Sequence, residues 1–504
     1  RDVERSRGLG DVYKRQGKIV EGTICYTGDI TDPNETKYTL DYYVKKAKEL
    51  ESLGVHIFTI KDMAGLVKPY AAKKLISALK EELNIPVNLH THDSTGNGVS
   101  TLLMASEAGL DIADCAIGSM SSMTSNPCMN SLVEALKGTE RDTGLNPDEL
   151  TELSQYYARI RPIYKQFESG MDAPNTEIYK YEIPGGQYSN LLAQVKEMGA
   201  AEDFEEIKGL YKDANQLLGN IVKVTPSSKV VGDFAIFMFK NGLTKENILE
   251  VGKDLSYPDS VVEYFEGMIG QPEGGFPEEL QKIVLKDKKP IDVRPGSLLP
   301  DEDFDYIAKG LKENFYTENM EDPDVLSQKT LSYALYPKVY EDYCRHFEAY
   351  NDVTGLESHV YFYGLRKGEE TTLKLDEGKY LIIKFIDMTE PDEDGYRLLD
   401  FEVNGSIREI KVLDKNLEVK TDRRVKADKS NPAHLGSTIP GTVGKVLVNE
   451  GDEVTVNMPL MTVEAMKMET TVVSTVNGKV DKIYVKEGEQ VNQEDLLISF
   501  EIDE

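Results

Sequence analysis

The first part of the chain alternates short apolar segments with longer segments in which apolar residues recur every three to four positions. A short apolar run is typical of a buried strand, and a recurrence of three to four is typical of an amphipathic helix. The pattern predicts strands over residues 19–26, 57–60, 87–89 and 112–117, and helices over 38–53, 69–83 and 99–108. Strands and helices that alternate in this way form a parallel sheet with helical crossovers.

Polar or reactive residues follow each predicted strand, among them Lys61, His90 and Ser119. This is typical of a (β/α)8 barrel of the TIM type, whose chemistry lies at the carboxyl ends of its strands. Four strands are half of such a barrel, and a half-barrel leaves two unpaired edges and an uncovered interior face. We therefore expect residues 17–140 to be the C-terminal half of a barrel, with the first four strands encoded upstream of this chain.

The rest of the chain predicts three further regions of a multidomain α/β protein. Residues 141–354 mix amphipathic helices with Pro- and Gly-rich loops. Residues 355–430 change to strands, predicted at 360–363, 380–385, 399–403 and 409–412, with Asn404 and Gly405 as a hairpin turn. Residues 435–503 predict a small all-β domain, a flattened barrel.

Residues 435–503 contain two copies of one strand pattern. The stretch from Gly441 to Leu460 recurs 37 positions later, from Gly478 to Leu497. Such self-similarity means that one short unit is used twice, here with quasi-twofold symmetry. Lys467 lies between two methionines on the hairpin that joins the halves. A lone lysine would simply be an exposed turn residue, but the repeat around Lys467 favours a lysine presented for a covalent cofactor.

Composition narrows the possible partners. The formal net charge of −30 argues against nucleic acid and anionic membranes as partners, because phosphate binding depends on clustered Lys and Arg. No apolar run approaches the ~20 residues of a spanning helix, and the four cysteines lack CxxC spacing, which argues against a disulfide framework. We expect a cytoplasmic protein with no membrane partner. Residues 1–16 are arginine-rich without apolar periodicity and are expected to be a non-native leader.

The first chemical signal in the barrel region is a histidine pair, which by itself is a weak signal. His90 and His92 are two positions apart at a strand end, so both imidazoles point to the same face and can bind one ion. A solvent-facing pair without metal is the alternative, and the barrel position beside Lys61 favours the metal. As an ammonium, Lys61 would repel a divalent cation and would instead pair with Asp62 or Asp93.

Thr124 lies on a Ser- and Met-rich loop after the last predicted strand of the barrel region. Ser125, Asn126 and Pro127 precede a helical run through Lys137. By itself this favours Thr124 as the N-cap of that helix.

Several motifs carry a family resemblance. The segments IKDMAGL at 60–66, HTHD at 90–93 and SMSSMTS at 119–125 are similar, in order, to the last four strands of the carboxyltransferase barrel of the pyruvate carboxylase family. EAMKME at 464–469 resembles the biotinyl carrier domain of biotin-dependent carboxylases. FEVNG at 401–405 resembles the tetramerisation and allosteric region of the same family, and residues 141–354 resemble its helical funnel over the barrel mouth.

The resemblance implies roles for five residues. Lys467 would form an amide with biotin; a lipoyl carrier shares the fold, but its lysine usually follows an acidic residue. Lys61 would be carbamylated by CO₂ and would bind zinc or manganese together with His90 and His92. A fourth ligand, an aspartate of the first barrel strand, would lie outside this chain. Thr124 would relay a proton between the methyl group of pyruvate and biotin.

The reaction implied by the resemblance is transfer of a carboxyl group from carboxybiotin on Lys467 to pyruvate, giving oxaloacetate. ATP would be used by an N-terminal part outside this chain, a biotin protein ligase would load Lys467, and the full-length ligase would be a homotetramer. Two alternatives stay open. One is a subunit of an oxaloacetate decarboxylase or transcarboxylase. The other is a biotin-carrier fragment that is catalytically inactive because half of the barrel is absent.

Overall fold

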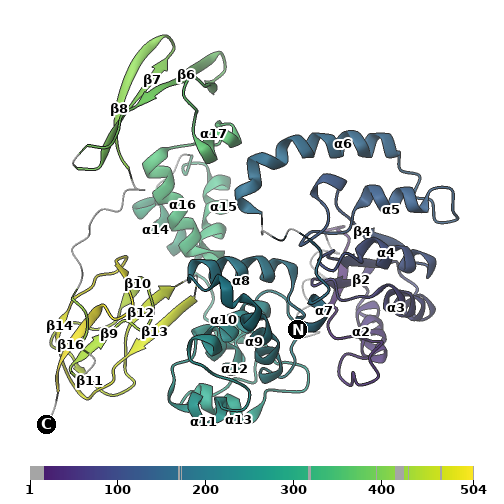
Figure 1. Ribbon diagram of the computed structural model, residues 1–504, viewed down its shortest axis with the longest axis horizontal. Helices are drawn as coiled ribbons and strands as arrows, with labels where there is room; N and C mark the ends of the chain where they lie inside the picture. The colour runs from purple at the N-terminus through teal and green to yellow at the C-terminus, as the bar shows by residue number, and fades with distance from the viewer. Residues whose placement is uncertain are drawn as a thin grey trace. The chain divides into compact units, whose positions relative to one another are not determined.

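Figure 1 shows the computed structural model of the chain. The structure describes residues 16–168, 171, 173–315, 319–392, 394–414, 425–428, 431–465 and 468–502. The chain divides into two compact units. One unit consists of Arg1–Gly296 with Arg424–Glu504, and the other of Ser297–Arg423.

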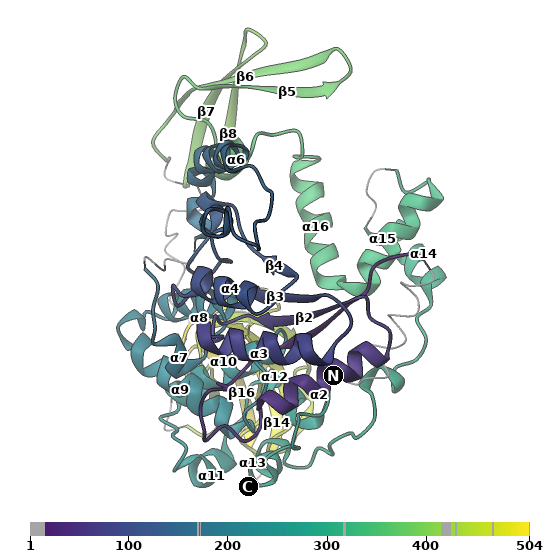
Figure 2. The same ribbon diagram turned by 90° about the vertical axis from the view of Figure 1, so that its right-hand side faces the viewer.

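A four-stranded parallel sheet forms the beginning of the first unit (Figure 2). Its strands lie side by side in chain order: β1 (Glu21–Cys25), β2 (Ile57–Asp62), β3 (Val87–Thr91) and β4 (Ile112–Asp114). They alternate with the helices α2 (Leu40–Ser52), α3 (Pro69–Glu82) and α4 (Gly98–Glu107). The alternation of strands and helices predicted from the apolar pattern is therefore confirmed.

The two faces of this sheet differ in chemistry. Phe58 of β2 and Leu89 of β3 are fully buried in a hydrophobic cluster that includes Leu75 of α3. Because adjacent residues of a strand point to opposite faces, Lys61 and His90 lie on the face away from this cluster. Burial of one face against the helices thus leaves the predicted site residues on the other.

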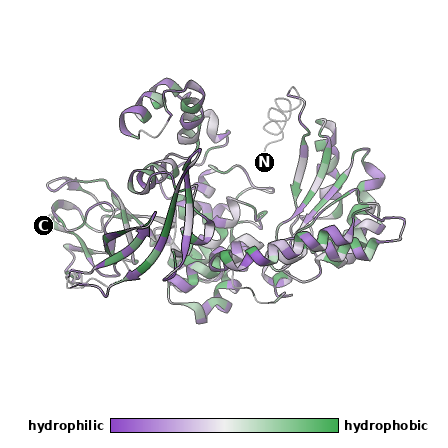
Figure 3. Ribbon diagram, turned by 90° about the horizontal axis from the view of Figure 1, so that it is seen from above, coloured by the Kyte–Doolittle hydropathy of each residue, from purple (hydrophilic) through white to green (hydrophobic). Residues whose placement is uncertain are grey.

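Helices make up the remainder of the first unit up to Gly296. Their bounds are α5 (Met129–Leu136), α6 (Pro147–Ile160), α7 (Ile178–Tyr181), α8 (Gly185–Glu197), α9 (Phe204–Leu217), α10 (Ser227–Lys240), α11 (Ile248–Val251), α12 (Asp259–Glu266) and α13 (Glu278–Leu285). α10 packs against α9 and α12, with Val231, Phe234 and Ile236 fully buried. Hydrophilic and hydrophobic residues alternate around many of the helices (Figure 3). Within the described ranges, no helix combines the length and apolar character that crossing a membrane requires.

The second unit combines four helices with an antiparallel sheet. The helices are α14 (Phe304–Asn314), α15 (Pro323–Leu335), α16 (Pro337–Tyr350) and α17 (Ser358–Tyr363), and the strands β5 (Glu370–Asp376), β6 (Lys379–Met388), β7 (Tyr396–Val403) and β8 (Ser406–Leu413) pair in chain order. Asn404 and Gly405, both at positive φ (48° and 80°), form the predicted hairpin turn.

The predicted strand at 360–363 is wrong, because these residues lie in helix α17. Val, Tyr and Phe favour strands only as a weak and context-dependent preference. Here Gly364, at φ 69°, ends the helix, and its N–H donates to the carbonyl of Val360. The helix end therefore outweighs the strand preference of the side chains.

The end of the chain forms two four-stranded sheets. One sheet has the strand order β13-β12-β10-β15 and the other β11-β14-β16-β9. The strands are β9 (His434–Gly436), β10 (Gly441–Val446), β11 (Glu453–Val454), β12 (Pro459–Ala465), β13 (Met468–Val473), β14 (Gly478–Ile483), β15 (Gln490–Val491) and β16 (Leu496–Ile502). β14, β15 and β16 each begin 37 positions after β10, β11 and β12 (441 to 478, 453 to 490, 459 to 496), so the predicted repeat is confirmed.

Candidate active site

The predicted site residues Lys61, His90 and His92 lie at the carboxyl edge of the parallel sheet. Lys61 and His90 are the second-to-last residues of β2 and β3 and pair directly across the sheet. Asp114 ends β4 and pairs with His90 from the other side. Neighbouring strands are about 4.8 Å apart, so three adjacent strands bring Lys61, His90 and Asp114 together. His92 follows β3 by one residue.

Each histidine ring is anchored through its Nδ1 atom. His90 Nδ1 lies 2.8 Å from a carboxylate oxygen of Asp114, and His92 Nδ1 lies 2.6 Å from the backbone carbonyl oxygen of Thr124. The ring centroids are 5.5 Å apart. Because a carbonyl oxygen can only accept, Nδ1 of His92 carries the proton, and the lone pair remains on Nε2.

The surroundings keep His92 neutral. Burial lowers its pKa, and repulsion from the neighbouring His90 and Lys61 lowers it further, while the bond to Thr124 acts in the opposite direction. A neutral imidazole is the form that binds a metal. Within the described part of the chain, no further hydrogen-bond partner is found for Nε2 of either ring.

The donor set fits a divalent ion. In metal-binding histidines, the ring nitrogen that does not bind the metal is usually held by a carboxylate or a backbone carbonyl. His90 is held by a carboxylate and His92 by a backbone carbonyl. In the described ranges, no group of three His, Cys, Asp or Glu side chains is placed to hold a metal. Lys61, which the resemblance implies is a carbamate, would add one anionic oxygen to the two imidazole nitrogens. Two nitrogens and an oxygen suit zinc or manganese.

Lys61 does not pair with either neighbouring aspartate. Asp62 is fully buried and accepts hydrogen bonds from the backbone N–H groups of Leu66 and Val67 and from the hydroxyl of Thr91, at 2.8–2.9 Å. Adjacent residues on a strand face opposite sides, which separates Asp62 from Lys61. Burial raises the pKa of Asp62. Asp93 accepts from the backbone N–H of Gly98 at the start of α4. The salt-bridge alternative for Lys61 is therefore wrong.

Thr124 is not a helix N-cap. α5 begins at Met129, and its cap residue is Cys128, without a side-chain cap bond. The loop instead brings the carbonyl of Thr124 to His92. Gly185, the first residue of α8, covers this contact, and a Cβ atom added there would lie 3.1 Å from both His92 Nδ1 and the Thr124 carbonyl oxygen. The close approach explains why glycine occupies this position.

Two residues of the site were missed by the sequence-based prediction. Asp114 is a polar residue at the end of the strand next to His90, and that position in the strand pattern was the available signal. Lys223 lies in the segment 223–229, which reads as a turn, yet its ammonium is buried against Thr27, just beyond β1. Nothing in the local sequence indicates this contact, because the two residues are 196 positions apart.

Lys467, the predicted biotin attachment site, lies outside the described residues. β12 ends at Ala465 and β13 begins at Met468, and these two residues are paired in the antiparallel register. The two strands on either side of Lys467 in the sequence are thus neighbours in one sheet.

Three family descriptions match the chain. "HMGL-like" matches residues 26–156, "Conserved carboxylase domain" matches 178–384, and "Biotin-requiring enzyme" matches 432–500. Together with the sheet, the histidine pair and the repeated strands, they place the chain in the class of biotin-dependent carboxylases, with a TIM-type barrel region.

The relatives narrow the class further. Pyruvate carboxylase of Bacillus subtilis is 48% identical over 491 residues, 97% of this chain and 42% of that protein. The Staphylococcus aureus enzyme is 45% identical over 500 residues, 99% of this chain and 43% of that protein. The carboxyl transferase domain of Rhizobium etli pyruvate carboxylase matches with 42% identity and a TM-score of 0.75, covering 82% of this chain and 69% of that one.

The chain belongs to the pyruvate carboxylase family. It spans about two fifths of the length of the curated relatives it matches, which are 42% and 43% covered. The comparisons do not favour an oxaloacetate decarboxylase or transcarboxylase subunit.

Proposed function

We propose that this chain contributes the carboxyl-transfer site and the biotin carrier to a longer pyruvate carboxylase, which converts pyruvate to oxaloacetate. The observation that carries the proposal is the anchoring of both imidazoles at the sheet edge beside Lys61. A structure of the Rhizobium etli domain, 42% identical with a TM-score of 0.76, contains pyruvate and biocytin. The same ligand classes are expected at this edge.

His90, His92 and Lys61, the last as a carbamate, would hold the metal. A divalent ion held by these residues would supply positive charge beside a bound keto acid. The chain's own contribution is orientation. Asp114 fixes one ring and the Thr124 carbonyl fixes the other, so that both Nε2 atoms are available without rearrangement. Burial keeps His92 in its neutral form.

The carrier would be loaded at Lys467 by a biotin protein ligase. Biotin attached there would supply a mobile carrier for the carboxyl group. The strands β12 and β13, on either side of the attachment segment in the sequence, pair with each other up to Ala465 and Met468. The family membership supports ATP-dependent carboxylation of the attached biotin by the remainder of a longer protein and assembly as a homotetramer, both of which are part of this proposal.

The proton relay by the hydroxyl of Thr124 stays a prediction. The contact found at Thr124 uses its backbone carbonyl, not its side chain. A role for the hydroxyl is therefore separable from the anchoring of His92 by a substitution that keeps the backbone and removes the hydroxyl.

The experiment that tests the proposal uses two variants and one chimera. The chimera joins residues 17–504 to the N-terminal part of the Bacillus subtilis relative, and oxaloacetate formation is followed by a coupled assay with malate dehydrogenase. His90→Ala should abolish oxaloacetate formation and lower the zinc or manganese content measured by mass spectrometry. His56→Ala is the matched control, because His56 accepts from the backbone N–H of Val20, outside the site. Full oxaloacetate formation by His90→Ala would refute the proposal.

A further inference from the structure

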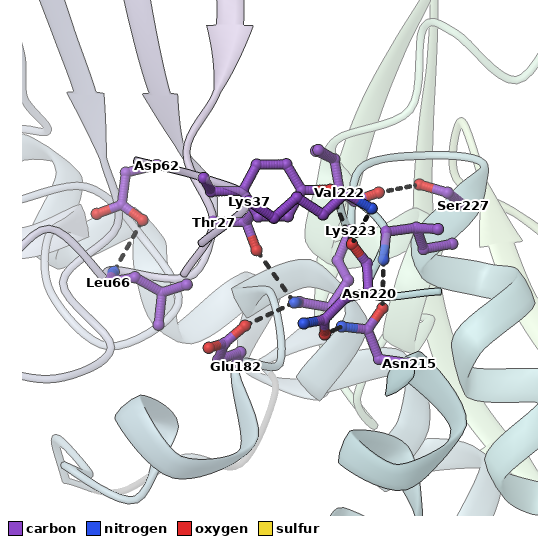
Figure 4. Close-up of polar contacts among 12 residues, drawn as sticks. Thr27, Lys37, Asp62, Leu66, Glu182, Asn215, Asn220, Val222, Lys223 and Ser227 are labelled. Carbon is purple, nitrogen blue, oxygen red and sulfur yellow. Dashed lines mark hydrogen bonds and ion pairs between the residues drawn. The ribbon is translucent and has the colours of Figure 1, made fainter. Parts of the chain in front are cut away.

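A buried lysine joins the helical part of the first unit to the end of strand β1. The side chain of Lys223 is 2% exposed, and its Nζ atom lies 2.7 Å from a carboxylate oxygen of Glu182. The same Nζ donates to the hydroxyl of Thr27 at 3.2 Å. Figure 4 shows the ammonium between these two partners. Lys223 comes from the segment before α10, and Thr27 follows β1 by two residues.

Thr27 is held on all of its polar atoms. It is 2% exposed, and its backbone N–H donates to the hydroxyl of Tyr43 at 2.9 Å. The hydroxyl of Tyr43 in turn donates to the Thr27 carbonyl at 2.8 Å. The bond from Lys223 occupies the remaining polar atom, the Thr27 hydroxyl. Thr27 therefore has one fixed orientation with respect to α2 and to Lys223.

The segment that carries Lys223 is held at its upstream end by the loop after β1. The ammonium of Lys37 donates to the carbonyls of Gly219 and Asn220, at 2.8 and 3.2 Å. The hydroxyl of Tyr38 also donates to the Asn220 carbonyl at 2.8 Å. The side chains of Lys37, Tyr38 and Lys223 thus connect the loop after β1 to the segment 219–223.

The downstream end of the segment is held by the first residue of α10. The hydroxyl oxygen of Ser227 lies 2.6 Å from the carbonyl oxygens of both Val222 and Val224, and its single proton can be donated to either of them. It also accepts from the backbone N–H of Val224 at 3.1 Å. Lys223 therefore lies in a segment fixed on both sides, and its ammonium is directed at the edge of the sheet.

Simple packing does not explain an ammonium at this position. Burying a charge is costly unless it is paired and hydrogen-bonded, and an apolar residue of similar size would often hold two elements together at least as well. The partner is also unusual, since Glu182 adopts the left-handed region at φ 55° without being glycine. A buried charge and a residue in an unfavourable conformation therefore coincide at one contact. Features of this kind concentrate at functional sites.

The contact lies close to the candidate metal site along the sheet. Cys25, the last residue of β1, pairs with Lys61 on β2, so Thr27 is two residues beyond the position opposite Lys61. The backbone N–H of Tyr26 donates to the Lys61 carbonyl at 2.8 Å. The position of Thr27 is thereby tied to the strand end that carries Lys61.

We propose that Lys223 is a positioning residue for carboxyl transfer, whose ammonium, held by Glu182, fixes Thr27 and sets the segment 223–227 against the strand ends that carry Lys61 and His90. This inference rests on the proposed function. The ammonium of Lys223 is buried between Glu182 and Thr27, and the proposal assigns it no direct contact with substrate. Its role is to fix the positions of Thr27 and of the segment 223–227 beside the strand ends of the site.

The test compares Lys223→Met with a matched buried lysine in the same chimera. Lys208 is the match, with its side chain 4% exposed and ion-paired to Glu177 at 2.8 Å and Glu205 at 2.7 Å. Lys223→Met should lower kcat for oxaloacetate formation at least tenfold and change KM for pyruvate less than threefold. Lys208→Met should lower the melting temperature and leave kcat within twofold. Equal kcat losses in both variants would show a general packing effect and overturn the proposal.

Two further variants separate the ammonium from the burial of charge. In Lys223→Met with Glu182→Gln, the unpaired carboxylate is gone, so the melting temperature should recover while kcat stays low. Recovery of kcat together with the melting temperature would overturn the proposal. Thr27→Val removes only the hydroxyl and should lower kcat three- to tenfold at an unchanged melting temperature. Parental kcat in Thr27→Val would also overturn it.

Hydrogen exchange on the 504-residue chain provides a readout that needs no activity. Lys223→Met should speed amide exchange in 27–31 and 219–224 at least tenfold, and Lys208→Met should not. No change in these two segments would refute the positioning role even if the chimera proves inactive. If His90→Ala abolishes oxaloacetate formation while Lys223→Met does not alter kcat, the proposed function holds and only this inference fails.

Discussion

Removing the carboxylate that anchors His90 should weaken metal binding in a graded way. Asp114 Oδ2 lies 2.8 Å from His90 Nδ1, and the Asp114 side chain is 42% exposed. Loss of a partner that orients a metal ligand typically lowers metal affinity about 10- to 100-fold. That range corresponds to about 1.4–2.8 kcal/mol. Because Asp114 is partly exposed, water can replace part of the bond, and we expect Asp114→Ala to fall at the lower end.

Asp114→Asn should have an intermediate effect. An amide oxygen still accepts from Nδ1 but carries no charge, and charge-assisted hydrogen bonds are roughly twice as strong as neutral ones. About half of the loss in free energy is therefore expected for Asn, or roughly a three- to tenfold weaker affinity. The order of affinities should be the parent, then Asp114→Asn, then Asp114→Ala.

The assay is competition for Zn²⁺ between the chain and a chromophoric chelator at pH 7.5. A double-mutant cycle with His90→Ala separates the anchoring role from a general change in charge: once His90 is gone, Asp114→Ala should lower affinity no further. Thr124→Val is the control, because His92 is anchored by a backbone carbonyl that this substitution keeps. Parental affinity in Asp114→Ala, together with a clear loss in His90→Ala, would refute the anchoring role.

Three further predictions concern other residues. Burial raises the pKa of Asp233 to about 6 from its usual 3.8. Between about pH 4 and 6 the folded state therefore binds a proton that the unfolded state has lost. The free energy of unfolding falls as the pH rises through this window, by up to about 3 kcal/mol. Asp233→Asn can still accept a hydrogen bond from Ser260. Its melting temperature should be higher than that of the parent at pH 7.5 and equal to it at pH 4. The same difference in melting temperature at both pH values would contradict the raised pKa of Asp233. Mass spectrometry after incubation with a biotin ligase, biotin and ATP should find one biotin on the chain and none on Lys467→Arg, and an unmodified parent would contradict the carrier assignment. Thr124→Val should abolish carboxyl transfer in the chimera while ATP-dependent biotin carboxylation continues; retained transfer would contradict the proton relay by Thr124.

Much of the local structure follows from the sequence pattern. The alternation of apolar strands and amphipathic helices determines the elements between β1 and β4, because burial of one face dictates where apolar residues recur. The two copies of one strand pattern, which start at Gly441 and at Gly478, likewise determine the two similar sheets at the end of the chain. The predicted strand at 360–363 fails, because a glycine-terminated helix and strand preference compete there and the sequence alone does not weigh them.

The sequence also identifies His90, His92 and Lys61 as site candidates, since position at a strand end fixes the face and edge on which a side chain lies. What holds those side chains is decided only by the tertiary structure. The contact between His90 and the Asp114 carboxylate depends on the register between β3 and β4. The contact between His92 and the Thr124 carbonyl depends on the path of the loop that carries Thr124. The bond from Lys223 to Thr27 spans 196 positions. Contacts of this kind arise from the packing of separate elements, so no local pattern in the sequence encodes them.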